Sequence, residues 1–272
     1  MTSLQRVIQY CAIALAVFLT VTIIGGIIGG VGIVIGLLDR DKDITGPMES
    51  YEISSQIENL DLEIGAAELK IVTGDRFLVE SNHKYLKVTE EEGTLKISEK
   101  KVFLCTSSKG VSVVLTVPEG FVFKDADIET GAGKVSVSAL SANTLALDLG
   151  AGKTEIGTLH VQSRCSISTG AGEVIIRDGV LNDLSMDHGV GRLELTGLLT
   201  GNCQVDFGIG DADVTLLGSQ GDYRIKLDKG LGDATLDGEA MTDGSTYGGG
   251  ENRIDISGGI GAIRIRFQGK NP

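Results

Sequence analysis

The chain has 272 residues, of which 39 are glycine, only 3 are proline and none is tryptophan, and its formal net charge is −13. Glycine has about twice its usual share of ~7%, without the three-residue period that a collagen helix requires. The negative charge excludes nonspecific binding to nucleic acids, which depends on basic side chains that neutralise phosphates. It also disfavours contact with anionic lipid surfaces.

The first predicted element is an apolar segment within residues 1–43. No charged side chain occurs from Val7 to Leu38, and ~20 apolar residues are enough for a helix to span a bilayer. A cleaved signal peptide would have a shorter apolar core, of about 7–15 residues, followed by a small-residue cleavage site. We therefore expect an uncleaved, single-pass transmembrane helix, a location in the cell membrane and the membrane itself as a partner.

Basic residues hardly decide the orientation of this helix, because Arg6 precedes it and Arg40 and Lys42 follow it. Large C-terminal domains translocate largely regardless of charge, so we expect the rest of the chain to be extracytoplasmic. Small residues four apart, such as Gly25 and Gly29, are compatible with a homodimer formed by close helix packing. They are equally compatible with the general frequency of glycine in membrane helices.

Residues 44–124 are predicted to form an irregular β region. Leu60 to Ile64 alternates apolar and acidic residues, and a strand from Val111 to Val117 is stopped by Pro118. Repeat folds need caps, because an uncovered sheet edge can pair with another chain. We expect this region to cap one end of the repeat that follows.

Residues 125–272 contain seven G-x-G tripeptides at a nearly constant spacing. They begin at Gly131, Gly150, Gly170, Gly189, Gly208, Gly230 and Gly259. The first five steps are 19 to 22 residues and the last is 29, where Glu239 to Asn252 indicates a loop insertion. Gly65-Ala66-Ala67 is a degenerate earlier copy. A fixed period near 20 residues is typical of stacked repeat folds.

Apolar residues recur in the same phase of every repeat. They stand five and three positions before the first glycine, between the two glycines, and six positions after the first; in one repeat they are Leu145, Leu147, Ala151 and Ile156. Residues two apart share one face of a strand, which predicts that these positions form the core. Each repeat then reads as a strand, a glycine corner, a second strand and a return.

Stacking the repeats at ~4.8 Å would pair each strand with its copies above and below and join the apolar positions into one core. We therefore predict an all-β fold. Its architecture would be a parallel β-solenoid (β-helix) of about 20-residue coils, preceded by one N-terminal transmembrane helix.

The cysteines are not expected to form a disulfide. Cys165 and Cys203 fall in the same core column two coils apart, which separates them by ~9.6 Å, beyond the ~7 Å between Cα atoms that a disulfide tolerates. Both are predicted to be small core hydrophobes. Cys11 lies in the anchor, and Cys105 has no partner in the repeat phase.

No catalytic or cofactor-binding group is predicted. His83, His160 and His188 fall in different phases of the repeat, whereas a zinc site needs clustered ligands, so we expect each to be a surface side chain. No phosphate-binding glycine motif occurs. We therefore expect a protein that is not an enzyme and holds no cofactor.

Acidic residues form an outward-facing column two positions before the corner glycines. The column comprises Glu63, Glu129, Asp148, Asp187, Asp206 and Asp228. Three positions after the first glycine, Lys134, Lys153 and Arg192 are predicted to pair with these acids across the corner. Stacked carboxylates repel unless a positive charge neutralises them.

The C-terminal half is more acidic, because Asp211 and Asp233 replace the basic residues there. With Asp206 and Asp228 they are expected on two adjacent coils, which makes the four carboxylates candidate ligands for calcium. A solvated acidic face without metal is the simpler interpretation. Paired carboxylates can also cleave glycosides, but such sites use aromatic residues for stacking, and the chain is only 4% aromatic.

Several runs resemble a known family. They are Val113 to Gly120 (VVLTVPEG), Ile128 to Val135 (IETGAGKV), Leu149 to Lys153 (LGAGK) and Ser168 to Val174 (STGAGEV). Together they resemble the bacterial "putative adhesins" of the DUF4097 type, over about Glu52 to Phe267. The resemblance implies a cell-surface β-solenoid, often membrane-anchored, linked to adhesion and by association to envelope-stress systems. It brings no catalytic residues and names no ligand.

These observations lead us to expect a membrane-anchored, extracytoplasmic β-solenoid that acts as an adhesin-like or envelope-associated binding module, with an unknown envelope or protein partner. One alternative is an accessory or sensor subunit of an envelope-stress response that acts through its anchor. A second alternative is a carbohydrate-active solenoid enzyme, which a clustered carboxylate pair in a deep cleft would favour.

Overall fold

The computed structural model describes residues 44–54, 56–99 and 110–269. The described residues from Thr45 onward belong to one compact unit. The predicted transmembrane helix, Cys11 and Cys105 lie outside the described residues. Within the described ranges, no helix is long and apolar enough to cross a membrane. Most described residues lie in strands, interrupted by the short 3-10 turn η1 (Gln220–Asp222), so the all-β prediction is confirmed.

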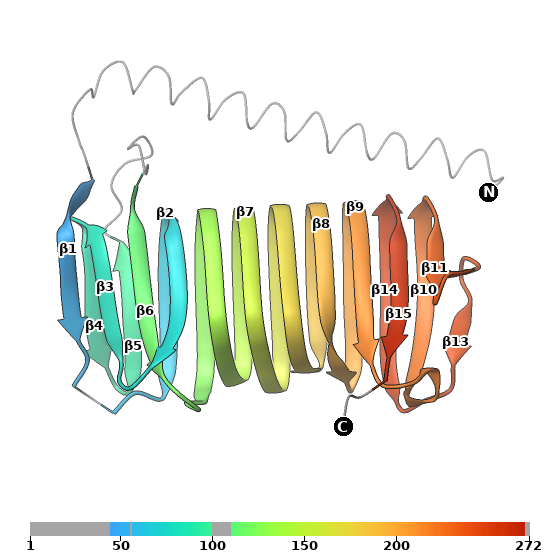
Figure 1. Ribbon diagram of the computed structural model, residues 1–272, viewed down its shortest axis with the longest axis horizontal. Helices are drawn as coiled ribbons and strands as arrows, with labels where there is room; N and C mark the ends of the chain where they lie inside the picture. The colour runs from blue at the N-terminus through green and yellow to red at the C-terminus, as the bar shows by residue number, and fades with distance from the viewer. Residues whose placement is uncertain (1–43, 55, 100–109, 270–272) are drawn as a thin grey trace, which may run out of the picture. The chain divides into compact units, whose positions relative to one another are not determined.

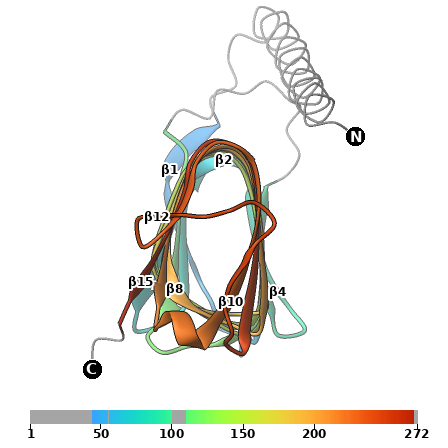
Figure 2. The same cartoon turned by 90° about the vertical axis from the view of Figure 1, so that its right-hand side faces the viewer.

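The central strands follow successive turns of the chain, which lie side by side in Figure 1. They are β2 (Asn59–Gly74), β7 (Phe123–Asn182), β8 (Leu184–Thr200) and β9 (Asn202–Leu217). Each turn runs along one arm, bends at its glycine corner and returns along a second arm, and the corners form the narrow arch where β2 is labelled in Figure 2. β7 passes through three corners, so one label covers three coils.

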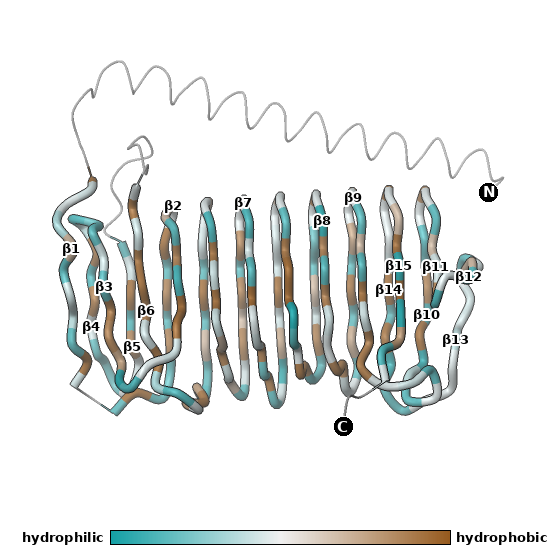
Figure 3. Tube along the Cα trace, in the orientation of Figure 1, coloured by the Kyte–Doolittle hydropathy of each residue, from teal (hydrophilic) through white to brown (hydrophobic). Residues whose placement is uncertain are grey.

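Neighbouring coils pair in parallel, one repeat apart. Leu60 lies beside Ala126 and Ile71 beside Val137 in the pairing of β2 with β7. The same phase joins β7 to β8 and β8 to β9. Apolar and polar residues therefore come to similar heights in successive coils, as the hydropathy colouring in Figure 3 shows.

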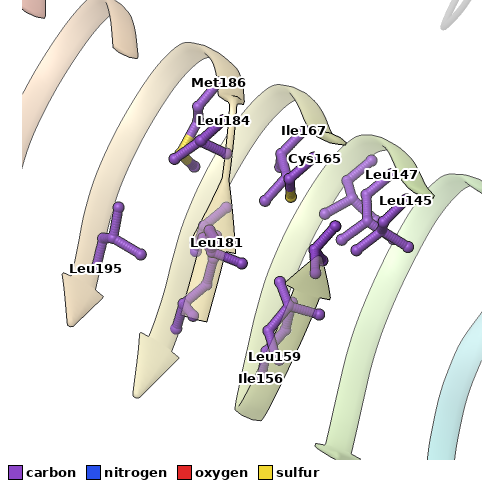
Figure 4. Packing of buried hydrophobic residues seen from close by; sticks show 14 of the residues in the cluster. Leu145, Leu147, Ile156, Leu159, Cys165, Ile167, Leu181, Leu184, Met186 and Leu195 are labelled. Carbon is purple, nitrogen blue, oxygen red and sulfur yellow. The ribbon is translucent and has the colours of Figure 1, made fainter. Parts of the chain in front are cut away.

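The core lies between the two arms. Leu145, Leu147 and Ile156 are at most 5% exposed, so the predicted core positions within the arms are confirmed. Figure 4 shows them packed with the equivalent residues of the next coils. Cys165 and Cys203 are free and buried in the same core, and burial raises the pKa of their thiols to about 12 and about 11, respectively.

The last two repeats stack in the reverse of their chain order. The Gly259 coil, formed by β14 (Asn252–Ile260) and β15 (Ile263–Gln268), pairs in parallel with β9 on one side. On its other side it pairs in parallel with the Gly230 coil, formed by β10 (Tyr223–Leu231) and β11 (Ala234–Leu236). The expectation that repeats stack one after another along the chain is therefore wrong at this end.

The insertion between these two repeats allows the reversal. It contains β12 (Glu239–Ala240) and β13 (Thr246–Gly248), which pair antiparallel with β11 and β10. The insertion thus covers the outer edge of the Gly230 coil before the chain returns to lie beside β9. Covering an open edge removes a template for unwanted strand pairing.

Five further strands flank the first coil at the opposite end of the stack. They are β1 (Thr45–Glu52), β3 (Leu78–His83), β4 (Leu86–Glu91), β5 (Thr94–Glu99) and β6 (Ser112–Pro118). β6 and β5 continue the two arms of β2 in parallel, β3 and β1 then follow β6, and β4 follows β5. The region expected to act as a cap therefore contains one complete coil, β2, and the strands beyond it.

Candidate functional site

The corners bring the backbones of adjacent coils unusually close. The second glycine of each G-x-G tripeptide has a φ between 138° and 146°, a conformation that side chains rarely adopt. A Cβ added at Gly210 would lie 1.7 Å from the carbonyl oxygen of Gly191 in the next coil. Glycine is therefore required at the corner, and the face built from the corners has little freedom to move.

The residue between the two glycines faces outward, not into the core as predicted. Val190, Ile209, Leu231 and Ile260 are 43%, 37%, 39% and 39% exposed. The alternation that places apolar residues inside an arm does not continue through the corner, because the backbone turns there. In the first half of the stack, alanines such as Ala132 and Ala151 hold this position and are also exposed.

The four large aliphatic side chains lie in a continuous row. Val190 is paired with Ile209, Ile209 with Ile260, and Ile260 with Leu231. We call these four residues the aliphatic ladder. Ile260 is the last of them in the chain but the third in space, so the order of the residues in the row follows the reversed coil order.

The four candidate calcium ligands flank the ladder. Asp206 precedes Ile209 and Asp211 follows it on the second arm, and Asp228 and Asp233 bracket Leu231 in the same way. They do not lie on adjacent coils as predicted. Ser257 of the intervening coil pairs with both Asp206 and Asp228.

Two of these carboxylates already have partners. Asp211 accepts a hydrogen bond from the Ala262 N–H at 3.2 Å and forms an ion pair with Arg264 at 3.3 Å. These contacts, the backbone hydrogen bond first, lower the pKa of Asp211. Asp206 accepts a hydrogen bond from Gln204 at 2.7 Å. In the ranges that the structure describes, no group of three or more metal-binding side chains occurs.

Calcium is therefore not expected to stabilise the fold. Millimolar calcium should give the same melting temperature as magnesium or sodium at matched ionic strength, because screening relieves the repulsion equally. Differential scanning calorimetry of the wild type and of Asp211→Asn/Asp233→Asn measures this. A rise that only calcium produces, and that the double substitution removes, would contradict the expectation and restore these aspartates as ligands.

The basic residues beside the corner pair along the second arm, not across the corner as predicted. Lys153 lies 2.9 Å from Glu155 and 2.9 Å from Glu173. Arg192 pairs with Glu194 and with Asp213. The acids they meet share the outer face of the same arm, which brings them closer than the acids of the first arm. Lys153 and Arg192 are thus engaged on the second arm and not with the first-arm column.

Two of the three histidines are buried, which corrects the prediction that all lie on the surface. His83 is 5% exposed and its Nε2 lies 3.1 Å from Glu99, whose other oxygen accepts a hydrogen bond from the Gly65 N–H. The hydroxyl of Ser81 donates to the Ser112 carbonyl, so it makes no nucleophile–base contact with the His83 ring of the kind a catalytic triad requires.

His188 lies just before its corner and is 1% exposed. Its Nδ1 is 2.6 Å from the hydroxyl of Thr169, and its ring lies 5.1 Å from that of Phe207. Its Nε2 is buried without a hydrogen-bond partner. Burial lowers the pKa of His188, because an apolar environment disfavours the charged imidazolium.

Acid should therefore destabilise the fold through His188. The pKa of His188 in the folded state lies below its unfolded value of ~6.5. The stability that the neutral, buried His188 contributes is therefore fully present above pH ~6.5 and is lost as the pH falls toward the folded-state pKa. His188→Phe, which copies Phe207 of the next coil, should remove up to ~1.4 kcal/mol per pH unit of this dependence. Denaturant unfolding from pH 7.5 to 4.5 tests it; parallel curves for both proteins would contradict it.

Two cavities beneath the corners are small. One is lined by residues that include Thr130, Thr154, Thr169 and His188, and another by residues that include Phe207 and Lys229; each holds about 10 Å³. Sites for small ligands usually have volumes of ~300–1,000 Å³. These two interior spaces are too small for a substrate, and a more open hollow of about 240 Å³ beside Ala67, Ala132 and Lys134 also lies below that range.

A family model described as "Toastrack DUF4097" matches residues 50–252. The chain belongs to the DUF4097 family. The match spans β2, β7, β8, β9 and the Gly230 coil, and so includes the corners of Val190, Ile209 and Leu231. The resemblance seen in the sequence is confirmed.

Solved structures similar to this DUF4097 chain include a "putative cell adhesion protein" from Clostridium sporogenes, at 18% identity and a TM-score of 0.35, covering 81% of this chain and 99% of that one. A "putative adhesin" from Bacteroides fragilis has 12% identity and a TM-score of 0.32, with coverages of 81% and 96%. A "putative lipid binding protein" from Parabacteroides distasonis has 20% identity and a TM-score of 0.41, with coverages of 81% and 97%. No curated protein matches the chain.

The sequence did not reveal two features at the corners of this DUF4097 chain. The repeat phase located the residues of the aliphatic ladder but assigned them to the core. His188 was placed on the surface, although it stands in the same repeat position as the buried Phe207. That shared position was the one signal in the sequence that could have placed His188 inside.

Proposed function

We propose that this DUF4097 chain is a membrane-anchored, extracytoplasmic β-solenoid that acts as an adhesin-like or envelope-associated binding module and not as an enzyme. The observation that carries the binding role is the aliphatic ladder. Single exposed apolar residues are common, whereas a contiguous apolar row on a soluble surface usually marks an interaction site.

The solenoid interpretation is supported by the parallel pairing of coil with coil, one repeat apart, from β2 to β9. Such a stack is a rigid scaffold, because each coil is held by its two neighbours. A rigid scaffold presents a binding surface without the entropy cost of ordering a loop.

The anchor is supported by the 32 uncharged residues from Val7 to Leu38, which exceed the length needed to cross a bilayer. An anchored protein can also act as an accessory or sensor subunit, but no described contact favours that role over binding. The enzyme alternative is weaker still, because the carboxylates of Glu129, Asp148 and Asp187 lie on an exposed outer face and not in a cleft.

Protease accessibility tests the membrane topology. Protease added to intact cells should digest the domain, and a membrane-impermeant thiol reagent should label Cys165 and Cys203 only after denaturation, because both are buried. Immunoblots with a C-terminal tag follow the digestion. Full protection in intact cells, with digestion after lysis, would place the domain in the cytoplasm and overturn the proposal.

Capture from envelope fractions tests the binding role. The full chain, solubilised with its apolar segment and immobilised through a C-terminal tag, should retain envelope components that an unrelated tagged single-pass protein does not. Quantitative mass spectrometry compares the two. Equal recovery on both baits would contradict a binding function.

A further inference from the structure

The aliphatic ladder is a straight, narrow ridge. Its four side chains come from four adjacent coils, so it extends over three coil spacings, or ~14 Å. The corners that carry it are tightly packed, because no Cβ fits between Gly210 and Gly191 or between Gly261 and Gly210. The ridge is therefore preorganised and changes little when a partner binds.

Carboxylates line both sides of this ridge. Asp187, Asp206 and Asp228 lie along the first arm, and Asp211 and Asp233 along the second. Arg192 and Arg264, the nearest cations on the second arm, are engaged with Glu194, Asp211 and Asp213. On the first arm, Lys229 directs its ammonium to the Gly232 carbonyl at 3.3 Å, beside Leu231. Carboxylates still outnumber cations around the ladder, which gives it a negative potential in keeping with the chain's net charge of −13.

An apolar ridge between rows of carboxylates favours some binding partners over others. A second copy docked ridge to ridge would bring aspartates against aspartates, which is unfavourable at close range. An anionic membrane would be repelled for the same reason. A partner with apolar side chains in a row and basic side chains beside them matches both the ladder and its flanks.

We propose, building on the binding function above, that the aliphatic ladder docks a cationic amphipathic helical segment of a partner polypeptide. Neighbouring residues on one face of a helix lie ~5–6 Å apart, close to the ~4.8 Å between coils. A helix along the ridge thus places one apolar side chain near each of Val190, Ile209, Ile260 and Leu231. Its lysines and arginines then reach the aspartates on either side.

Apolar contact and charge have separable roles in this binding. Burial of the ladder provides most of the affinity, whereas the aspartates accelerate association and make it sensitive to salt. Docking is confined to the second half of the stack, since the first half has alanines such as Ala132 and Ala151 in the equivalent positions.

A synthetic peptide tests the proposal. The full chain is placed in nanodiscs of neutral lipid, and binding of a fluorescent 18-residue leucine–lysine amphipathic helix is measured by anisotropy, with empty nanodiscs subtracted. Val190→Ser/Ile209→Ser/Leu231→Ser/Ile260→Ser should weaken binding at least tenfold. The matched control Val122→Ser/Val180→Ser changes two aliphatic residues of similar exposure outside the ladder and should leave affinity unchanged. Asp206→Asn/Asp228→Asn should reduce the salt dependence.

Several results would overturn this inference. The first is that the ladder variant binds the peptide as tightly as the wild type does, and the second is that a leucine–glutamate helix binds as well as the leucine–lysine helix. The third is that the wild type sediments as a dimer and the ladder substitutions abolish this dimer. The fourth is that the wild type, but not the ladder variant, adsorbs to vesicles of neutral lipid. The third would assign the ladder to a second copy and the fourth to lipid. If envelope capture persists in the ladder variant, the binding function stands and only the docking site is wrong.

Discussion

Gly210→Ala should prevent stable folding of the stack. The substitution meets two penalties, because Gly210 has a φ of +139° and its new Cβ would lie 1.7 Å from the Gly191 carbonyl oxygen. That oxygen belongs to the backbone of a neighbouring coil and cannot rotate away as a side chain would. We expect a loss above ~4–5 kcal/mol, the upper end for single substitutions, measured by chemical denaturation followed by circular dichroism.

Two other glycines separate the penalties. Gly238 has a φ of +87° with open space around it, so Gly238→Ala should cost only the backbone strain, ~1–2 kcal/mol. Gly249 has neither a positive φ nor a neighbour within 4 Å, so Gly249→Ala should be nearly neutral. If Gly210→Ala costs no more than Gly238→Ala, the corners are not in close contact and the ladder is not preorganised.

Leu147→Asp should be similarly severe. Leu147 is 5% exposed between the arms, and a carboxylate there would be buried among apolar side chains without a partner. We expect a loss of ~4 kcal/mol or more in the free energy of unfolding, or an insoluble product. Thermal melts and urea titrations of the purified chain measure it.

The adjacent residue provides the control. Asp148 is exposed and makes no ion pair in the part of the chain that the structure describes, so Asp148→Ala should change stability by less than ~0.5 kcal/mol. Equal losses for the two substitutions would mean that the inward and outward faces of this arm have been exchanged.

The arms could be read from the sequence because each obeys a simple alternation. Leu145 and Leu147 both point inward because of this alternation, and Cys165 occupies the position of Leu145 in the next coil. The corner could not be read in this way. Its geometry depends on a positive φ and on contact with the next coil, and both are tertiary properties that turn Ile209 outward.

Predicting which aspartates lie on neighbouring coils also requires long-range information. The sequence places Asp228 one repeat after Asp206, but the Gly259 coil lies between them in space. The insertion before that coil was recognised, although its effect on stacking order was not. Likewise, Lys153 was expected to face the first arm, whereas Glu155 and Glu173 are nearer partners on its own arm.

Thiol crosslinking tests the continuous ladder most directly. In a background with Cys11→Ser and Cys105→Ser, paired cysteines are introduced at positions 209, 231 and 260, and treated with a crosslinker that spans one coil spacing of ~4.8 Å but not two. Ile209→Cys/Ile260→Cys and Leu231→Cys/Ile260→Cys should crosslink, and Ile209→Cys/Leu231→Cys should not. Crosslinking of Ile209→Cys/Leu231→Cys without crosslinking of Ile209→Cys/Ile260→Cys would show that the coils stack in chain order and would contradict the order of the ladder. The absence of a crosslink in all three pairs would show that these aliphatic residues form no continuous row.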